Sequence, residues 1–72
     1  MKAYIARDQQ GTLVIYKTRP YKNEDFGVWH GAVLFPAKLI IKRESKAVKA
    51  ISWADTAAKE IELKATFKLI KQ

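Results

Sequence analysis

Residues 61–69 read IELKATFKL, in which every odd position is apolar and every even position from Glu62 to Lys68 is polar. Successive side chains of a β-strand point to opposite faces of a sheet, so this stretch predicts a strand with one buried and one exposed face. A helix fits less well, because apolar residues two positions apart would spread around its circumference. The alternation therefore predicts a sheet protein whose sheet is covered on one side only.

The chain has 72 residues, which predicts a single small domain over 1–72. Chains of this size bury only about 60% of the surface that their unfolded form exposes, so the core must be thin. The sequence has no cysteine, so neither disulfides nor a cysteine-ligated zinc can add stability. We expect either that the sheet suffices alone or that a second subunit contributes, which makes a homo-oligomer the alternative to a monomer.

The N-terminal residues, MKAYIARD, lack the apolar run of a signal peptide. The longest apolar stretch, residues 31–37, is too short to span a bilayer. The absence of cysteine agrees with a reducing compartment. We therefore expect a cytoplasmic protein without a membrane segment.

A β-hairpin is predicted at the N-terminus, from residues 3–7 and 12–17, which are rich in β-branched and aromatic types. Asp8 favours the start of a type I turn, and Gly11 can take the left-handed conformation that closes such a hairpin. Residues 18–27 should then break the sheet and fold the aromatic side chains of Tyr21 and Phe26 back onto it.

Two further strands are expected at 28–35, with a bulge at Gly31, and at 37–43. For residues 44–59 we expect a helical turn near 45–48, a strand at 49–53 and a turn at 54–59; the alternative is one helix through the region.

The predicted fold class is thus small all-β or α+β, a mainly antiparallel curved sheet of about five strands with an N-terminal hairpin and at most one short helix. The predicted core is Tyr4 or Ile5, together with Leu13, Ile15, Val33, Phe35, Leu39, Ile41, Ile51, Trp53, Ile61, Leu63, Phe67 and Leu69.

Residues that carry enzymatic chemistry are nearly absent. The sequence has one histidine, His30, no cysteine and no glycine-rich phosphate loop. A catalytic or metal-binding His30 would need a nucleophile or further ligands nearby, and nothing in its neighbourhood suggests them. We therefore predict that the protein is not an enzyme and has neither a cofactor nor a metal site.

Positive charge dominates the sequence: fourteen Lys and Arg residues stand against seven Asp and Glu, for a net charge of +7. Such a field favours polyanions, nucleic acid or an acidic protein face among them. The alternative is that the charge only keeps a small sheet soluble and its edges unpaired.

The cations gather between Lys38 and Lys49, where Glu44 is the one acidic residue. If the strand at 37–43 lay beside the final strand, lysines of both would line one exposed face and contact phosphates. The predicted nucleic-acid contacts, to the backbone rather than to bases, are Lys38, Lys42, Arg43, Lys46, Lys64 and Lys68. Four aromatic residues are candidates for stacking on bases, with a place in the core as the alternative: Tyr16, Tyr21, Trp29 and Trp53.

A second functional hypothesis uses the sheet edge. Open sheets end in strands with unpaired backbone groups, which can pair with another chain. The regular final strand is a candidate for such an edge, so the alternative function is a protein-interaction or oligomerisation module.

The segments AYIARD at 3–8, GTL at 11–13, KTRPY at 17–21 and ISWAD at 51–55 resemble small uncharacterised proteins of gut bacteria and of their phages and mobile elements. The resemblance covers about half of the chain. Those proteins carry more acidic residues after the tryptophan, where this chain has Ala57, Ala58 and Lys59, which puts a shared acidic surface in doubt. The resemblance implies an accessory role in a bacterium or phage and no catalytic activity.

Overall fold

The computed structural model describes residues 1–63, in which two antiparallel sheets are joined by short connections. The elements, in chain order, are β1 (Lys2–Arg7), β2 (Leu13–Tyr16), β3 (Tyr21–Asn23), β4 (Val28–His30), β5 (Val33–Pro36), the 3-10 turn η1 (Ala37–Leu39), the single helical turn α1 (Lys46–Lys49) and β6 (Lys59–Glu62). The main sheet has four strands in the order β5-β2-β1-β6, and β3 and β4 form a separate pair. The predicted fold class is therefore confirmed.

The N-terminal hairpin forms as predicted, by local turn chemistry. The Asp8 carboxylate accepts hydrogen bonds from the backbone amides of Gln10 and Thr12, each at 2.9 Å. Gly11 has φ +96°, which an L side chain rarely adopts, so any other residue there would strain the backbone. The turn sets the register that places Ile5 opposite Ile15.

Strand β6 pairs with β1 and follows the predicted alternation as far as the structure describes it. Ile61 lies opposite Ala3 and is half-buried against the core, whereas Glu60 and Glu62 are exposed. The remainder of the predicted strand, with Phe67 and Leu69, lies outside the described residues.

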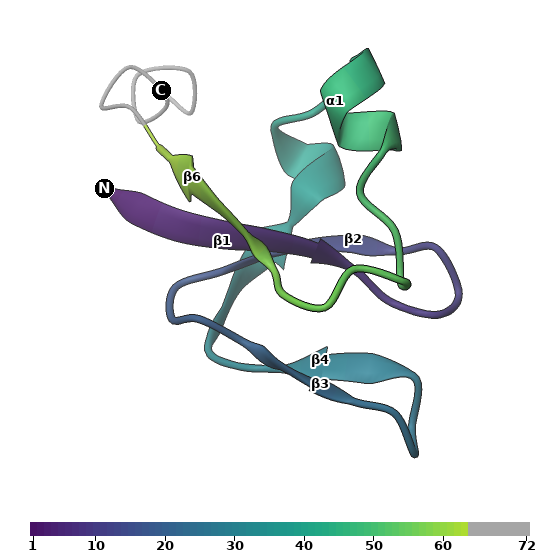
Figure 1. Cartoon of the computed structure of the whole chain (residues 1–72). Helices are drawn as coiled ribbons and strands as arrows, with labels where there is room; N and C mark the ends of the chain where they lie inside the picture. The colour runs from purple at the N-terminus through teal and green to yellow at the C-terminus, as the bar shows by residue number, and fades with distance from the viewer. Residues whose placement is uncertain (64–72) are drawn as a thin grey trace.

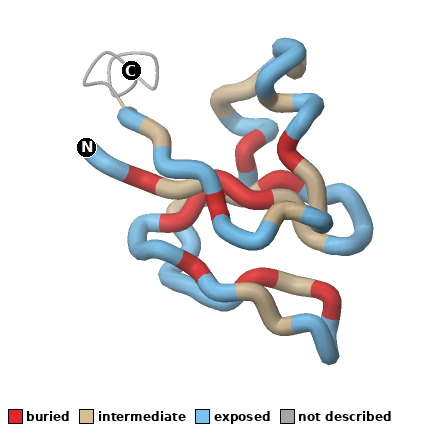
Figure 2. Tube along the Cα trace, viewed as in Figure 1, coloured by how far each residue is buried: buried red, intermediate tan, exposed pale blue. Residues whose placement is uncertain are grey.

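The prediction of a one-sided sheet is wrong, because both faces of the main sheet are covered. One face carries Ala3, Ile5, Leu13 and Ile15, packed beneath the connection that contains η1 and α1. The opposite face carries Ala6 and Tyr16 and is covered by Trp29 of β4. Figure 1 shows α1 and the β3–β4 hairpin on opposite sides of the sheet, and Figure 2 shows the buried residues following β1 and β2 between them. Strands β1 and β2 carry apolar residues at both odd and even positions, so both faces of the sheet must be shielded from water.

The strand predicted at 28–35 is in fact two strands in different sheets. The chain leaves β4 at Gly31, and Lys17 donates a backbone hydrogen bond to Ala32 at 2.7 Å before β5 begins. A Cβ at Gly31 would lie 3.0 Å from the backbone of Pro20, so any larger residue would push Pro20 aside, and glycine suits this close crossing. The predicted break over 18–27 contains the short strand β3, and Tyr21 and Phe26 do not fold back but are exposed.

The strand predicted at 37–43 is also wrong. Ala37 is buried, and its carbonyl accepts hydrogen bonds from the amides of Ile40 and Ile41 at 3.0 and 2.8 Å. The inward positions 37, 40 and 41 follow helical spacing, which leaves Leu39 exposed.

Residues 44–59 contain the predicted helical turn and a turn that overlaps the one predicted at 54–59, but not the predicted strand. The Ser45 hydroxyl caps α1 by accepting from the amide of Val48 at 3.3 Å, whereas neither the strand at 49–53 nor the alternative long helix is present. The turn expected at 54–59 begins earlier, with a bond from the Asp55 amide to the Ser52 carbonyl at 3.1 Å, and Lys59 already belongs to β6.

The predicted core is confirmed at its centre and wrong at two positions. Ile5, Leu13, Ile15 and Ile51 are buried. Phe35, Ile41, Trp53, Ile61 and Leu63 are half-buried against the two clusters. Val33 and Leu39 are exposed.

Candidate functional site

The connection between β5 and β6 carries most of the unpaired positive charge of the described chain. We call residues 37–50 the basic segment, and its five cations, all exposed, are Lys38 on η1, Lys42 and Arg43 in the loop, and Lys46 and Lys49 on α1. Among residues 1–63, none of these five side chains forms an ion pair. The segment therefore presents its charge to solvent, where an anionic partner can reach it.

Arg7 anchors this segment to the sheet. Its guanidinium donates to the carbonyls of Ile51 at 2.6 Å, Gly11 at 2.9 Å and Val48 at 3.2 Å, and to the carboxylate of Glu44 at 3.1 Å. The Arg7 side chain is only 18% exposed. Because Arg7 binds Glu44, the one acidic residue of the segment is neutralised from the sheet side.

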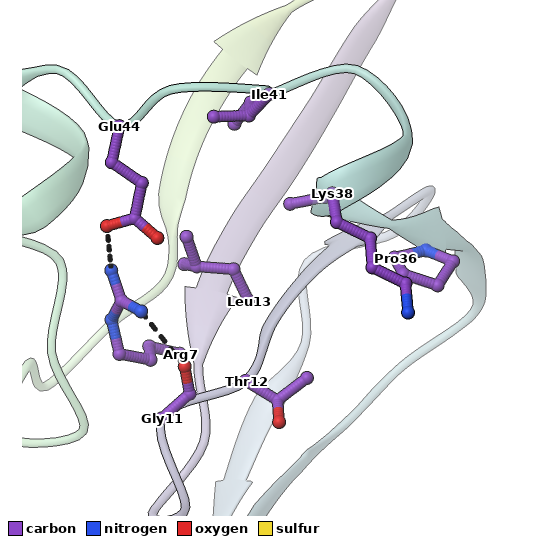
Figure 3. Close-up of a pocket in the computed structure, with 9 residues that line it drawn as sticks. Arg7, Gly11, Thr12, Leu13, Pro36, Lys38, Ile41 and Glu44 are labelled. Atoms are coloured by element: carbon purple, nitrogen blue, oxygen red, sulfur yellow. Dashed lines mark hydrogen bonds and ion pairs between the residues drawn. The ribbon is translucent and has the colours of Figure 1, made fainter.

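A cleft lies between the basic segment and the β1–β2 turn. Its volume is about 420 Å³, and its lining residues are Arg7, Gly11, Thr12, Leu13, Pro36, Ala37, Lys38, Ile41 and Glu44. Figure 3 shows the Arg7–Glu44 pair on one side, Pro36 and Lys38 on the other, and Leu13 between them. The cleft thus combines an apolar floor with a charged rim, a combination typical of binding sites.

The two glutamates of β6 pair with cations outside the basic segment. Glu60 pairs with Lys2 at 3.4 Å and Arg19 at 3.6 Å, and Glu62 pairs with the N-terminal ammonium at 2.7 Å. The hydrogen bond from that ammonium lowers the pKa of Glu62. Both glutamates lie on β6, so their charge is used at the edge of the main sheet.

The structure brings four of the predicted contact residues together: Lys38, Lys42, Arg43 and Lys46 all belong to the basic segment. Their expected arrangement along a strand is wrong, because 37–43 is not a strand; they follow a 3-10 turn, a loop and a helical turn instead. Lys64 and Lys68 lie outside the described residues.

Three of the four candidate stacking residues belong to the core or its edge. Tyr16 and Trp29 are buried, and Trp29 packs edge-on against half-buried Trp53 with ring centroids 6.1 Å apart. The fourth, Tyr21, is exposed on β3 and lies against His30, away from the basic segment.

Sequence reasoning missed the cleft and the role of Arg7. One signal was present: Arg7 shares the parity of Ala3 and Ile5, so its side chain points to an apolar face of the sheet. A guanidinium in that position must find carbonyl or carboxylate partners. Apart from Gly11, its partners come from 37 to 44 residues further along the chain, and local patterns do not reveal such pairs.

Among residues 1–63 there is no helix with the length and apolar character needed to cross a membrane. Comparison with protein-family models, curated proteins and solved structures finds no significant match for this chain. The resemblance to small proteins of gut bacteria and phages therefore stays a prediction.

Proposed function

We propose that the protein binds nucleic acid through phosphate contacts made by the basic segment. The observation that carries this proposal is the local charge: five exposed, unpaired cations stand within 37–50, while Glu44 is held by Arg7. Lys38, Lys42, Arg43 and Lys46 act as phosphate contacts, with Lys49 beside them. Contacts of this kind position the backbone and carry no sequence information.

Salt dependence is the physical signature of this mode of binding. Each phosphate that a cation neutralises releases condensed counterions, so the logarithm of the binding constant falls linearly with the logarithm of salt concentration. For four or five contacts the expected slope is about −4 on duplex DNA and about −3 on a single strand. The base sequence of the nucleic acid should have little effect on affinity.

The test is a fluorescence anisotropy titration of labelled single-stranded and duplex DNA and RNA over a range of salt concentrations. Binding with the expected slope supports the proposal. No binding at low salt, or binding that ignores salt, overturns it.

A matched pair of variants tests the location. Lys42→Gln with Lys46→Gln removes two cations from the basic segment and should reduce the slope by about 2. Lys17→Gln with Lys59→Gln removes the same charge from two other exposed positions, Lys17 directly after β2 and Lys59 on β6. The second variant should keep most of the slope; an equal loss in both would mean that only net charge matters.

A further inference from the structure

The turn between β3 and β4 exposes an aromatic side chain next to two acidic residues. We call residues 24–27 the hairpin tip. Phe26 is 77% exposed, and the preceding Glu24 and Asp25 are exposed. Neither carboxylate forms an ion pair within the part of the chain that the structure describes. An apolar side chain so exposed has a cost in water, which burial against a partner would remove.

The hairpin tip is held in one conformation. The Asn23 side-chain oxygen accepts from the amides of Asp25 at 3.1 Å and Phe26 at 3.3 Å. Gly27 has φ +69° and its carbonyl accepts from the Gln9 amide at 3.0 Å, which fastens the tip to the β1–β2 turn. A contact made by Phe26 therefore requires little ordering of the backbone, and preorganisation of this kind favours binding.

The cleft beside the basic segment is complementary to the hairpin tip. Its floor contains the apolar residues Leu13, Pro36, Ala37 and Ile41, and Lys38 belongs to its wall. Lys42 and the other cations of the basic segment follow in the chain, opposite in sign to the tip. The two surfaces lie on opposite sides of the main sheet (Figure 1), so the tip does not fill the cleft of its own chain.

We propose that the hairpin tip of one copy docks into the cleft of a second copy, with Phe26 on the apolar floor and Glu24 and Asp25 facing the basic segment. The contact joins two different surfaces, so it generates either closed rings or open chains. It is small and partly electrostatic, and interfaces of this size are weak and favoured by low salt. It needs no nucleic acid, although nucleic acid bound to the same segment would compete with it.

Sedimentation equilibrium without nucleic acid tests the proposal. At about 50 mM salt the average mass should rise with protein concentration, and at about 500 mM the rise should diminish. Phe26→Ala should weaken association about tenfold, as expected for an aromatic anchor. Val33→Ala, which truncates another exposed apolar residue away from the tip, should leave it unchanged. A strict monomer, or association that Phe26→Ala leaves intact, overturns the proposal.

Charge exchange identifies the two surfaces. Glu24→Lys with Asp25→Lys makes the tip basic. Lys38→Glu, Lys42→Glu and Lys46→Glu together make the segment beside the cleft acidic, with only Arg43 and Lys49 left as cations. Each variant alone should therefore lose self-association. Mixing the two variants should restore association, because opposite charges then face each other in both contacts. Failure of the mixture to associate overturns the pairing. Phe26→Ala changes neither the basic segment nor the net charge, so its binding to nucleic acid reports on the proposed function separately.

Discussion

The guanidinium of Arg7 lies 3.1 Å from the carboxylate of Glu44, 37 residues further along the chain, and joins β1, an inner strand of the main sheet, to the basic segment. The same guanidinium also donates to the carbonyls of Gly11, Val48 and Ile51, of which the Val48 carbonyl accepts from the Ile51 amide as well, at 3.0 Å. Arg7 is therefore the residue through which the sheet positions the candidate site.

Replacing Arg7 should destabilise the protein. Arg7→Ala leaves the carbonyls of Val48 and Ile51 without this donor, and we expect a loss of about 2–3 kcal/mol in the free energy of unfolding. Glu44→Gln keeps an acceptor for Arg7 and should cost less than about 1 kcal/mol. Urea denaturation followed by tryptophan fluorescence measures both. Equal stability of the two variants would argue against the anchoring role.

Replacing Asp8 tests the turn that sets the hairpin register. Asp8→Ala removes the acceptor of two backbone hydrogen bonds and should destabilise the protein by about 1–2 kcal/mol. Asp8→Asn retains a side-chain oxygen that can accept both, so its loss should be less than half as large. The free energy of unfolding from urea titrations distinguishes the two; indistinguishable variants would mean that the charge, not the acceptor, matters.

Lys22 should contribute to the second face of the sheet. Its ammonium donates to the Trp53 carbonyl at 2.5 Å and lies 4.5 Å from the Trp53 ring centroid and 5.4 Å from that of Trp29. Lys22→Met retains the aliphatic stem but loses the charge, and we expect it to cost about 1 kcal/mol. A change in tryptophan emission should accompany the loss, because the ammonium lies beside both indoles. Unaltered emission and stability would exclude a contribution from this contact.

Local chemistry explains what the sequence predicts well. The hairpin follows from Asp8 and Gly11, which determine a turn without help from distant residues. The helical turn begins at Ser45, a residue type that caps helices. The exposed cations of the basic segment were equally predictable, because lysine and arginine are almost never buried without a partner.

Tertiary packing explains what the sequence does not predict. Residues 37–43 alternate well enough for a strand, yet Ala37 fits beneath the loop and imposes helical spacing on Ile40 and Ile41. The division of 28–35 depends on the close approach of Gly31 to Pro20, from a separate segment of the chain. The cleft depends on the Arg7–Glu44 pair, which joins residues that no short pattern connects.

Ionisation of Tyr16 should lower the free energy of unfolding at alkaline pH. Burial, and secondarily the charge of Asp8, raises the pKa of the Tyr16 phenol above its ordinary value of 10.0. The native state then holds the proton more tightly than the unfolded state, which begins to lose it near pH 10. The stabilisation is therefore complete below pH 10 and declines as the pH rises toward the native pKa.

Tyr16→Phe removes this titration and should flatten the decline in unfolding free energy above pH 10, measured by urea denaturation across the alkaline range. The hydroxyl bond to the Trp29 carbonyl is long, at 3.4 Å, so the variant should lose little stability at neutral pH. Tyr21→Phe is the control, because Tyr21 is exposed and its removal should leave the alkaline decline intact. A decline that persists unchanged in Tyr16→Phe would assign it to other groups, the lysines first among them.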